Sequence, residues 1–221
     1  LGLYDYGFYE AESTFPAHRR PIYFVRTGVR LNYNTTTTQK KLHVAMIDRI
    51  LETRLDRKGI IHAVSYDRAE FIKKHSRFGD YMMLHTGETT RAAVEQFKKA
   101  PWPAILVSPS IHTGWDFPYD MADWQIIAKV PFPNTSRGIA YARQKRDDTY
   151  DKRLAATTTV QMAGRIVRAA DDAGETFIVD DTWAWFYEHY RLLFPRFFRE
   201  ALSTVTTAPG PMPLDRARAG A

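Results

Sequence analysis

Short apolar segments alternating with helical ones constrain the fold of this sequence more than any other feature. The segments expected to be strands cover residues 21–25, 59–64, 81–84, 104–107, 124–130 and 176–179, the last being the final strand. They are apolar along their length instead of alternating, which is typical of strands buried on both faces of a parallel sheet. The connections leave room for right-handed crossovers. The sequence therefore predicts an α/β fold, a parallel β-sheet with helices on both faces.

Helical segments fill the gaps between these strands. They are expected over residues 38–55 and 67–76, from residue 89 or 90 onward, and as a long polar pair over 135–169. In the first of them, Leu42, Met46 and Ile50 fall four residues apart, so they share one helical face. An aromatic helical tail follows the last strand, and Pro195 begins its final helix. Its aromatic residues are expected to form core or a domain interface, and these are Trp183, Trp185, Phe186, Tyr187, Tyr190, Phe194, Phe197 and Phe198.

The 221 residues suffice for one sizeable core. We expect a connector or edge element from a preceding region over residues 1–25, the folded domain over 26–205, and a flexible tail over 206–221. The first residue is Leu and no charged-then-apolar leader follows, so a processed protein or a piece of a longer one is expected.

Composition narrows the classes of partner and location. The net charge of +6 and the pI near 9.5 favour polyanionic partners. No apolar run reaches the ~20 residues that cross a bilayer, so no membrane association is expected. The absence of Cys fits a reducing compartment, and a cytoplasmic location is expected.

Several catalytic classes lack their signatures. The seven His residues are scattered with no His-Glu-x-x-His pattern, and Cys is absent, so no metal site is expected. Ser108 and Ser110 lack a Gly-x-Ser-x-Gly elbow, which argues against a serine hydrolase.

Ligands of parallel sheets bind at loops beyond the carboxyl ends of the strands. These loops are expected to start at residues 65, 85, 108, 131 and 180. The first carries Ser65 and Tyr66, which suit phosphate contact and base stacking, or alternatively a helix cap and a half-buried ring. The third carries the stretch from Ser108 to Pro118. There Asp116 can orient an arginine or a ribose hydroxyl, or simply belong to a turn.

The segment Gln161-Met-Ala-Gly-Arg-Ile-Val-Arg168 precedes the last strand. Gln161, Arg165 and Arg168 are spaced i, i+4 and i+7, which places them on one face if the segment is helical. Two guanidinium groups and an amide on one face suit phosphate oxygens. Gly164 costs helix stability and indicates close approach of another group, such as a backbone. The alternative is an exposed basic face that forms salt bridges to Asp171 or Asp172.

Together, these segments resemble motifs IV, V and VI of superfamily 2 helicases, most closely those of the XPD/DinG type. The pattern is carried by Ser65-Tyr66, Gly114-Trp-Asp-Phe-Pro118, Lys129-Val-Pro-Phe-Pro133, Gln161-Met-Ala-Gly-Arg-Ile-Val-Arg168, Asp172-Ala-Gly174 and Asp180. It covers about residues 30–200. The resemblance implies a RecA-like fold, with residues 26–205 as the second, carboxyl-terminal motor domain.

The resemblance also implies roles for single residues. Arg168 would be the arginine finger, Arg165 its phosphate or structural partner, and Gln161 a member of the same nucleotide-facing set. Gly114 and Asp116 would couple the nucleotide cleft to the surface that holds the nucleic acid. The residues expected to face single-stranded nucleic acid are Ser65, Tyr66, Ser108, Ser110 and Thr113.

The implied enzyme is an ATP-dependent helicase whose partners are single-stranded DNA or RNA and the amino-terminal RecA-like domain of the same protein. The chain has no Gly-x-x-x-x-Gly-Lys-Ser/Thr loop and no Asp-Glu-x-His box. We therefore expect ATP and Mg²⁺ to be held mainly by the first motor domain, and this chain alone to bind neither and to be inactive. Two alternatives stay open: a non-catalytic RecA-like module that binds nucleic acid or protein, and the translocase half of a restriction or phage system.

Overall fold

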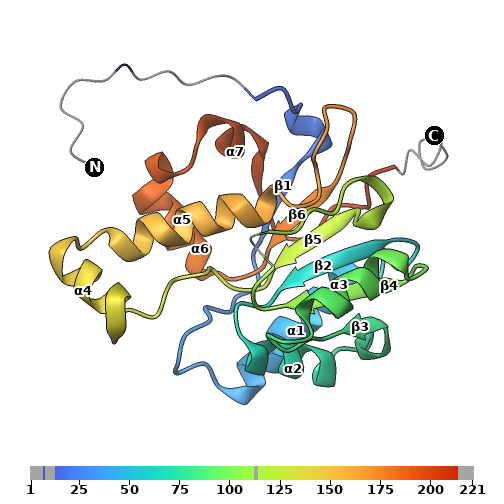
Figure 1. Cartoon of the computed structure of the whole chain (residues 1–221), viewed down its shortest axis with the longest axis horizontal. Helices are drawn as coiled ribbons and strands as arrows, with labels where there is room; N and C mark the ends of the chain where they lie inside the picture. Colours follow the sequence, from blue (N-terminus) through green and yellow to red (C-terminus); the bar gives the residue numbers. More distant parts are fainter. Residues whose placement is uncertain (1–6, 8–12, 112–113, 214–221) are drawn as a thin grey trace.

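The strands form one parallel sheet. The computed structural model describes residues 7, 13–111 and 114–213. Within these residues the sheet has seven strands in the order β3-β4-β2-β5-β6-β1-β7, and every neighbouring pair is parallel (Figure 1). They are β1 (Ile22–Val25), β2 (Lys58–His62), β3 (Met82–Met83), β4 (Ala104–Ser108), β5 (Trp124–Ile127), β6 (Glu175–Ile178) and β7 (Leu202–Val205). The predicted α/β class and all six predicted strands are confirmed.

Helices cover both faces of this sheet (Figure 1). The longer ones are α1 (Thr37–Leu51), α2 (Tyr66–His75), α3 (Thr90–Lys99), α4 (Gly138–Arg146), α5 (Tyr150–Ala163), α6 (Thr182–Tyr190) and α7 (Arg196–Ala201). Side chains of α1 and α2 pack against one face in a single cluster. Two clusters lie on the other face, one under α3 and one under α5, α6 and α7. This division follows the alternation of side chains along each strand.

Helix α1 turns most of its predicted face to the core: Ile50 and the neighbouring Ile47 and Leu51 are buried, and Leu42 is the exception. Leu42 is 56% exposed, whereas Val44, Ile47 and Leu51 are fully buried. The helix begins where predicted, because Thr36 and Gln39 form a reciprocal capping box at its first turn. It ends at Leu51 instead of residue 55. A strict four-residue spacing drifts around a helix of 3.6 residues per turn, so the buried stripe follows mixed three- and four-residue steps.

The seventh strand, β7, has no counterpart among the predicted ones. It pairs with β1, which itself lies inside the sheet between β6 and β7. Residues 22–25, predicted as a strand within the connector or edge element of residues 1–25, therefore belong to the sheet. The described residues 206–213 contain no helix or strand, but two carbonyls hold them to the domain. Arg54 Nη2 donates to Pro209 O at 3.0 Å, and Arg57 Nη1 donates to Met212 O at 2.9 Å.

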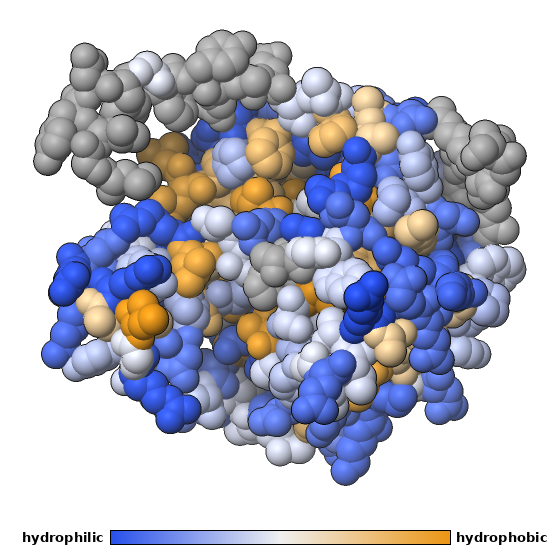
Figure 2. All heavy atoms as spheres, viewed as in Figure 1, coloured by the Kyte–Doolittle hydropathy of each residue, from blue (hydrophilic) through white to orange (hydrophobic). Residues whose placement is uncertain are grey.

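The aromatic tail builds part of the core, as predicted. Trp183, Phe186, Phe194 and Phe198 are almost fully buried and pack on one another in tilted and edge-to-face arrangements. Figure 2 shows apolar side chains gathered around α6 and α7, with hydrophilic ones over most of the remaining viewed face. Across the described residues, helices fall short of the length and apolar character that spanning a bilayer requires.

Candidate functional site

The carboxyl ends of the strands lie at one edge of the sheet because all neighbouring pairs are parallel. The loops expected after β2, β3, β4, β5 and β6 therefore meet there. Pairing of His62 with Ile127, and of Ile127 with Ile178, aligns the ends of β2, β5 and β6. Buried side chains of this edge organise its loops before any ligand binds.

At the end of β2, Ser65 caps helix α2. Its Oγ accepts the backbone N–H of Arg68 at 3.3 Å, the capping use that the sequence left open. Val64 just before it has a φ of 68°, a left-handed conformation that a β-branched residue seldom adopts. Tyr66 is 43% exposed, and its ring lies edge-on to His85 with the centroids 6.3 Å apart. The ring is therefore partly open to solvent.

At the end of β4, Ser108 does not reach the surface. It is fully buried, and its Oγ accepts the backbone N–H groups of Ser110 and Ile111 at 3.2 Å. His85 Nε2 lies 2.6 Å from the same oxygen. The expectation that Ser108 faces a nucleic acid is therefore wrong for this structure, because its hydroxyl shapes the loop. Ser110 is exposed, and Thr113 lies outside the described residues.

The segment that carries the two arginines is not one helical face. Helix α5 ends at Ala163, and the N–H of Gly164 closes it on Val160 O at 3.1 Å. A Cβ at Gly164 would meet only ordinary contacts, the nearest at 3.6 Å, so the expected close approach is absent there. Glycine destabilises a helix interior, so it is tolerated better at a helix end such as this one. Arg165 and Arg168 therefore lie in the loop between α5 and β6.

This loop brings the arginines to Asp116. Arg165 Nη1 donates to Trp115 O at 2.7 Å and to Asp116 Oδ1 at 3.3 Å, and the guanidinium of Arg168 pairs with the same oxygen. Arg165 Nε also donates to Gln161 O at 3.1 Å. Convergence of the three charged residues thus arises from two loops instead of from helical spacing.

The two guanidinium groups differ in exposure. The side chain of Arg165 is 13% exposed and that of Arg168 is 40% exposed, while Asp116 is half-exposed. Burial and the neighbouring Arg168 lower the pKa of Arg165, and Asp116 opposes this shift. Arg168 is therefore the more exposed member of the pair, and Arg165 is the one held by further contacts to Trp115 O and Gln161 O.

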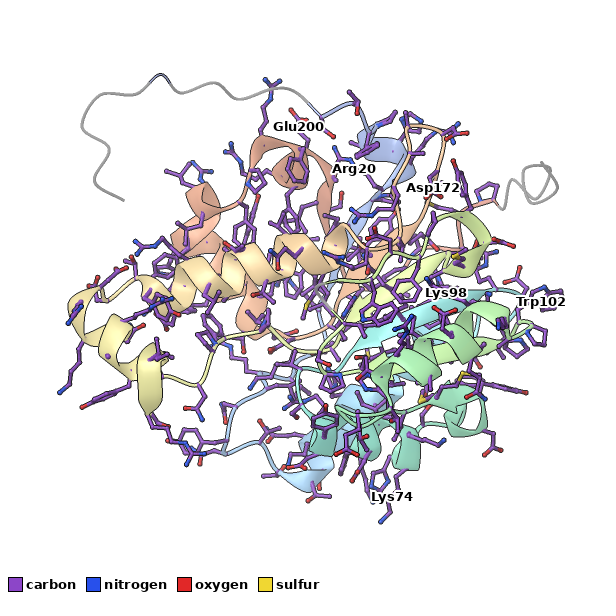
Figure 3. The ribbon with its side chains drawn as sticks, in the orientation of Figure 1. Arg20, Lys74, Lys98, Trp102, Asp172 and Glu200 are labelled. Carbon is purple, nitrogen blue, oxygen red and sulfur yellow. The ribbon has the colours of Figure 1, made fainter. Side chains whose placement is uncertain are left out.

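Backbone contacts join the two loops into one unit. Phe117 N–H donates to Arg165 O at 3.1 Å. Asp172 accepts the N–H groups of Tyr119 at 3.2 Å and Arg168 at 3.1 Å. Figure 3 shows Asp172 in the loop that leads from α5 to β6. Arg168 does not form the alternative salt bridge to Asp172. Its guanidinium pairs with Asp116, and its backbone N–H donates to the Asp172 carboxylate. Gly114, with a φ of 78°, allows the turn that precedes Trp115.

Asp180 and Asp181 hold further loops at the carboxyl edge. Asp180 is fully buried and accepts backbone N–H groups from Leu31, Val130 and Thr182 at 3.0–3.1 Å. Asp181 accepts those of Thr27 and Gly28 at 2.7 and 2.9 Å. Among the described residues, no three His, Asp or Glu side chains are arranged to hold a metal ion.

Three solved structures resemble this one. S. tokodaii Xpd4 has 17% sequence identity and a TM-score of 0.58, and the match covers 83% of this chain and 38% of that protein. An XPD helicase has 12% identity and a TM-score of 0.55, with 84% and 36% covered. S. cerevisiae Dbp5 bound to RNA and ADP BeF3 has 9% identity and a TM-score of 0.54, with 89% and 44% covered. At these identities the likeness concerns the fold, which confirms the RecA-like architecture.

This chain spans less than half the length of each of those three proteins. No curated protein matches its sequence significantly. The sequence profile of the helicase C-terminal domain matches residues 55–201, which include β2 to β6 and both arginine-bearing and aspartate-bearing loops. The chain therefore belongs to the helicase C-terminal domain family.

Proposed function

We propose that this chain is the carboxyl-terminal motor half of an ATP-dependent helicase or translocase that acts on DNA or RNA. Membership of the helicase C-terminal domain family supports the motor class. The observation that carries the proposal is the convergence of Arg165 and Arg168 on Asp116, with the Arg168 side chain 40% exposed. A partly exposed guanidinium whose counter-ion is itself half-exposed suits the phosphates of a nucleotide held by a neighbouring domain.

In this proposal Arg168 is the arginine finger. The guanidinium of Arg168 suits phosphate oxygens. Its counter-ion in this structure is Asp116, whose side chain is half-exposed. ATP with Mg²⁺ would be held mainly by the first motor domain and would supply the phosphoryl group that is cleaved. Arg168 would then neutralise charge that develops on that group. Arg165, fixed by Trp115 O and Gln161 O, would position Arg168 and the Gly114–Asp116 turn.

The carboxyl edge of the sheet is proposed as the surface for single-stranded nucleic acid. Tyr66 offers an exposed ring for base stacking, and Ser65, Ser110 and Thr113 are proposed to contact the strand. Ser108 is not included, because its hydroxyl accepts backbone N–H groups of its own loop. Dbp5, one of the proteins with a similar fold, is bound to RNA in its solved structure.

The finger role is tested in a protein that carries this chain together with its first motor domain. Arg168→Ala is expected to lower nucleic-acid-stimulated ATP turnover by at least ~10³-fold. Nucleotide affinity, measured by equilibrium titration, is expected to stay within a few-fold, because the first domain holds most of the nucleotide. Arg199→Ala, which removes an exposed arginine of α7, serves as the matched control and should keep full turnover. Unchanged turnover in the Arg168 variant would remove the finger role.

A further inference from the structure

Two cations lie at the carboxyl edge on neighbouring strand ends. Arg68 belongs to the first turn of α2, and its Nη1 lies 3.5 Å from Ala63 O, one residue beyond β2. Lys129 follows β5 by two residues. Because β2 and β5 are adjacent and His62 pairs with Ile127, Arg68 is held beside the strand end that leads into Lys129. Asp180 occupies the corresponding position after β6, the next strand of the sheet.

Neither cation has a carboxylate partner among the described residues. The long contact with Ala63 O is the single hydrogen bond of the Arg68 guanidinium there, and the Lys129 ammonium makes none. The charge of Asp180 acts on both cations, but Asp180 forms no salt bridge with Arg68 or Lys129. Its carboxylate already accepts three backbone N–H groups. The donors of Arg68 and Lys129 are therefore available to a ligand.

The charges of Arg68, Lys129 and Asp180 do not cancel, because two are positive and one is negative. Burial lowers the pKa of Arg68, and burial together with Arg68 lowers the pKa of Lys129, while Asp180 opposes both shifts. Burial also lowers the pKa of His43, which faces Asp180, to about 4, so that ring is neutral at pH 7. Two cations thus surround one carboxylate. Half-buried charge without a partner is unfavourable, and a bound anion would relieve it.

We propose that Arg68 and Lys129 form a seat for one phosphodiester group of the bound nucleic-acid strand. The seat rests on the proposed function and adds two residues to it. Two cations from neighbouring strand ends suit the two free oxygens of a phosphodiester. Tyr66, whose exposed ring opens the same helical turn, lies where a base attached to that phosphate would stack. This seat is built from other segments than the pair formed by Arg165 and Arg168, which lies in the loop between α5 and β6 and contacts Asp116 in the loop between β4 and β5.

The test measures binding of a fluorescent oligo(dT) to this chain by anisotropy at several salt concentrations. The double variant Arg68→Gln/Lys129→Gln is expected to bind about tenfold more weakly. The salt slope, d log K/d log [salt], should become shallower by about 0.7, the value for one phosphate contact on a single strand. Lys41→Gln/Lys74→Gln removes the same charge from exposed positions and should leave the slope unchanged. Figure 3 shows Lys74 pointing outward from α2.

Two further variants separate binding from folding. Arg68→Lys/Lys129→Arg keeps both charges and is expected to retain most of the affinity. The Gln variant should unfold at the same temperature as the wild type or higher, since it removes uncompensated charge. If the double variant fails to fold, the single variant Lys129→Gln is measured in its place. An equal slope and affinity in the Gln variant and in the wild type would overturn the seat while leaving the motor proposal intact.

The source of the phosphate is tested by competition. Millimolar ATP is expected not to displace oligo(dT) from the wild type. If ATP displaces the oligonucleotide from the wild type but not from the Gln double variant, the seat belongs to a nucleotide and the inference is overturned. If the wild type binds no oligonucleotide at low salt, the proposed nucleic-acid surface fails as well, and the seat falls with it.

Discussion

At the scale of single residues, Gly59 packs directly against the ring of Trp124. It pairs with Trp124 across β2 and β5, and a Cβ at Gly59 would overlap the atoms of the indole ring. The ring is fully buried and has no space to move away. Glycine is required here by close approach and not by backbone conformation.

We therefore expect Gly59→Ala to destabilise the fold by about 3 kcal/mol through overpacking. Chemical denaturation of the purified variant measures this. Gly87→Ala is the control, because its nearest neighbour, Tyr66 Oη, would be 3.6 Å from the new Cβ, an ordinary contact. That variant should change stability by less than about 1 kcal/mol. Equal stability of both variants would contradict the packing described.

Two titratable residues, the buried His43 and the half-buried Asp123, act on stability in opposite directions. Burial raises the pKa of Asp123 to about 6, so the folded state keeps a proton there that the unfolded state has lost. This contribution makes stability fall as pH rises from about 4 to about 6. Burial lowers the pKa of His43 to about 4, so the unfolded state binds the proton first on acidification. This contribution makes stability fall as pH drops from about 6.5 to about 4.

Single variants should uncover each contribution. Asp123→Asn is expected to leave a chain that loses more stability than the wild type on acidification from pH 6.5 to 4. His43→Gln is expected to do the reverse. Each difference in slope can reach about 1.4 kcal/mol per pH unit. Urea denaturation at a series of pH values measures it, and variants whose slopes match the wild type would contradict the burial of these groups.

At the scale of elements, a buried ion pair joins the turn after α1, strand β6 and the segment after β7. Arg54 and Glu175 form two hydrogen bonds at 3.0 Å with almost no exposure, and Arg54 also reaches Pro209 O. The guanidinium lies over the ring of Phe177, 4.6 Å from its centroid. Removal of one partner leaves the other charge buried and unpaired.

Glu175→Gln is therefore expected to destabilise the domain by about 3–5 kcal/mol. Glu200→Gln makes the same chemical change at the exposed pair with Arg196, and it should cost no more than about 0.5 kcal/mol. Thermal unfolding distinguishes the two readily, since about 1 kcal/mol shifts the midpoint of a domain of this size by about 2–4 °C. Similar midpoints for the two variants would argue against a buried pair.

The elements differ in how far the sequence predicts them. The central strands are mostly apolar and bounded by helices, so the local sequence pattern predicts their positions. The helices over 66–75 and 90–99 lie close to the segments predicted as helical, and Ala69, Ile72 and Val94 on their inward faces are buried. Strand β7 was missed because it follows α7 without a turn signal, and its residues are half-exposed at an edge. The end of α5 at Ala163 was missed because helical spacing continues through Arg168.

The candidate site was predictable in its members but not in its geometry. Asp116 and both arginines come from the motifs, whereas their convergence depends on how two loops fold on Asp172. Arg68 and Lys129 belong to no periodic pattern. Their shared position depends on the adjacency of β2 and β5, which are distant in sequence but paired in the sheet, as the register of Gly59 with Trp124 shows.

At the scale of the whole molecule, the chain offers arginines for a triphosphate but lacks a phosphate-cradling loop and an acidic Mg²⁺ box in its sequence. The cations that the two proposals use fall into two groups, Arg165 and Arg168 near Asp116, and Arg68 and Lys129 at the carboxyl ends of β2 and β5. A neighbouring domain that holds ATP would meet the first group, and a nucleic-acid strand would meet the second. In this account the chain is half of a motor, and neither group is sufficient for turnover alone.

The most direct test compares ATP hydrolysis by this chain alone with hydrolysis by the same chain joined to its first motor domain, both with saturating single-stranded nucleic acid. We expect no turnover above background for the chain alone. We expect stimulated turnover for the joined protein, abolished by Arg168→Ala. Stimulated turnover by the isolated chain, or full turnover by the joined Arg168 variant, would show that this chain is not the motor half proposed here.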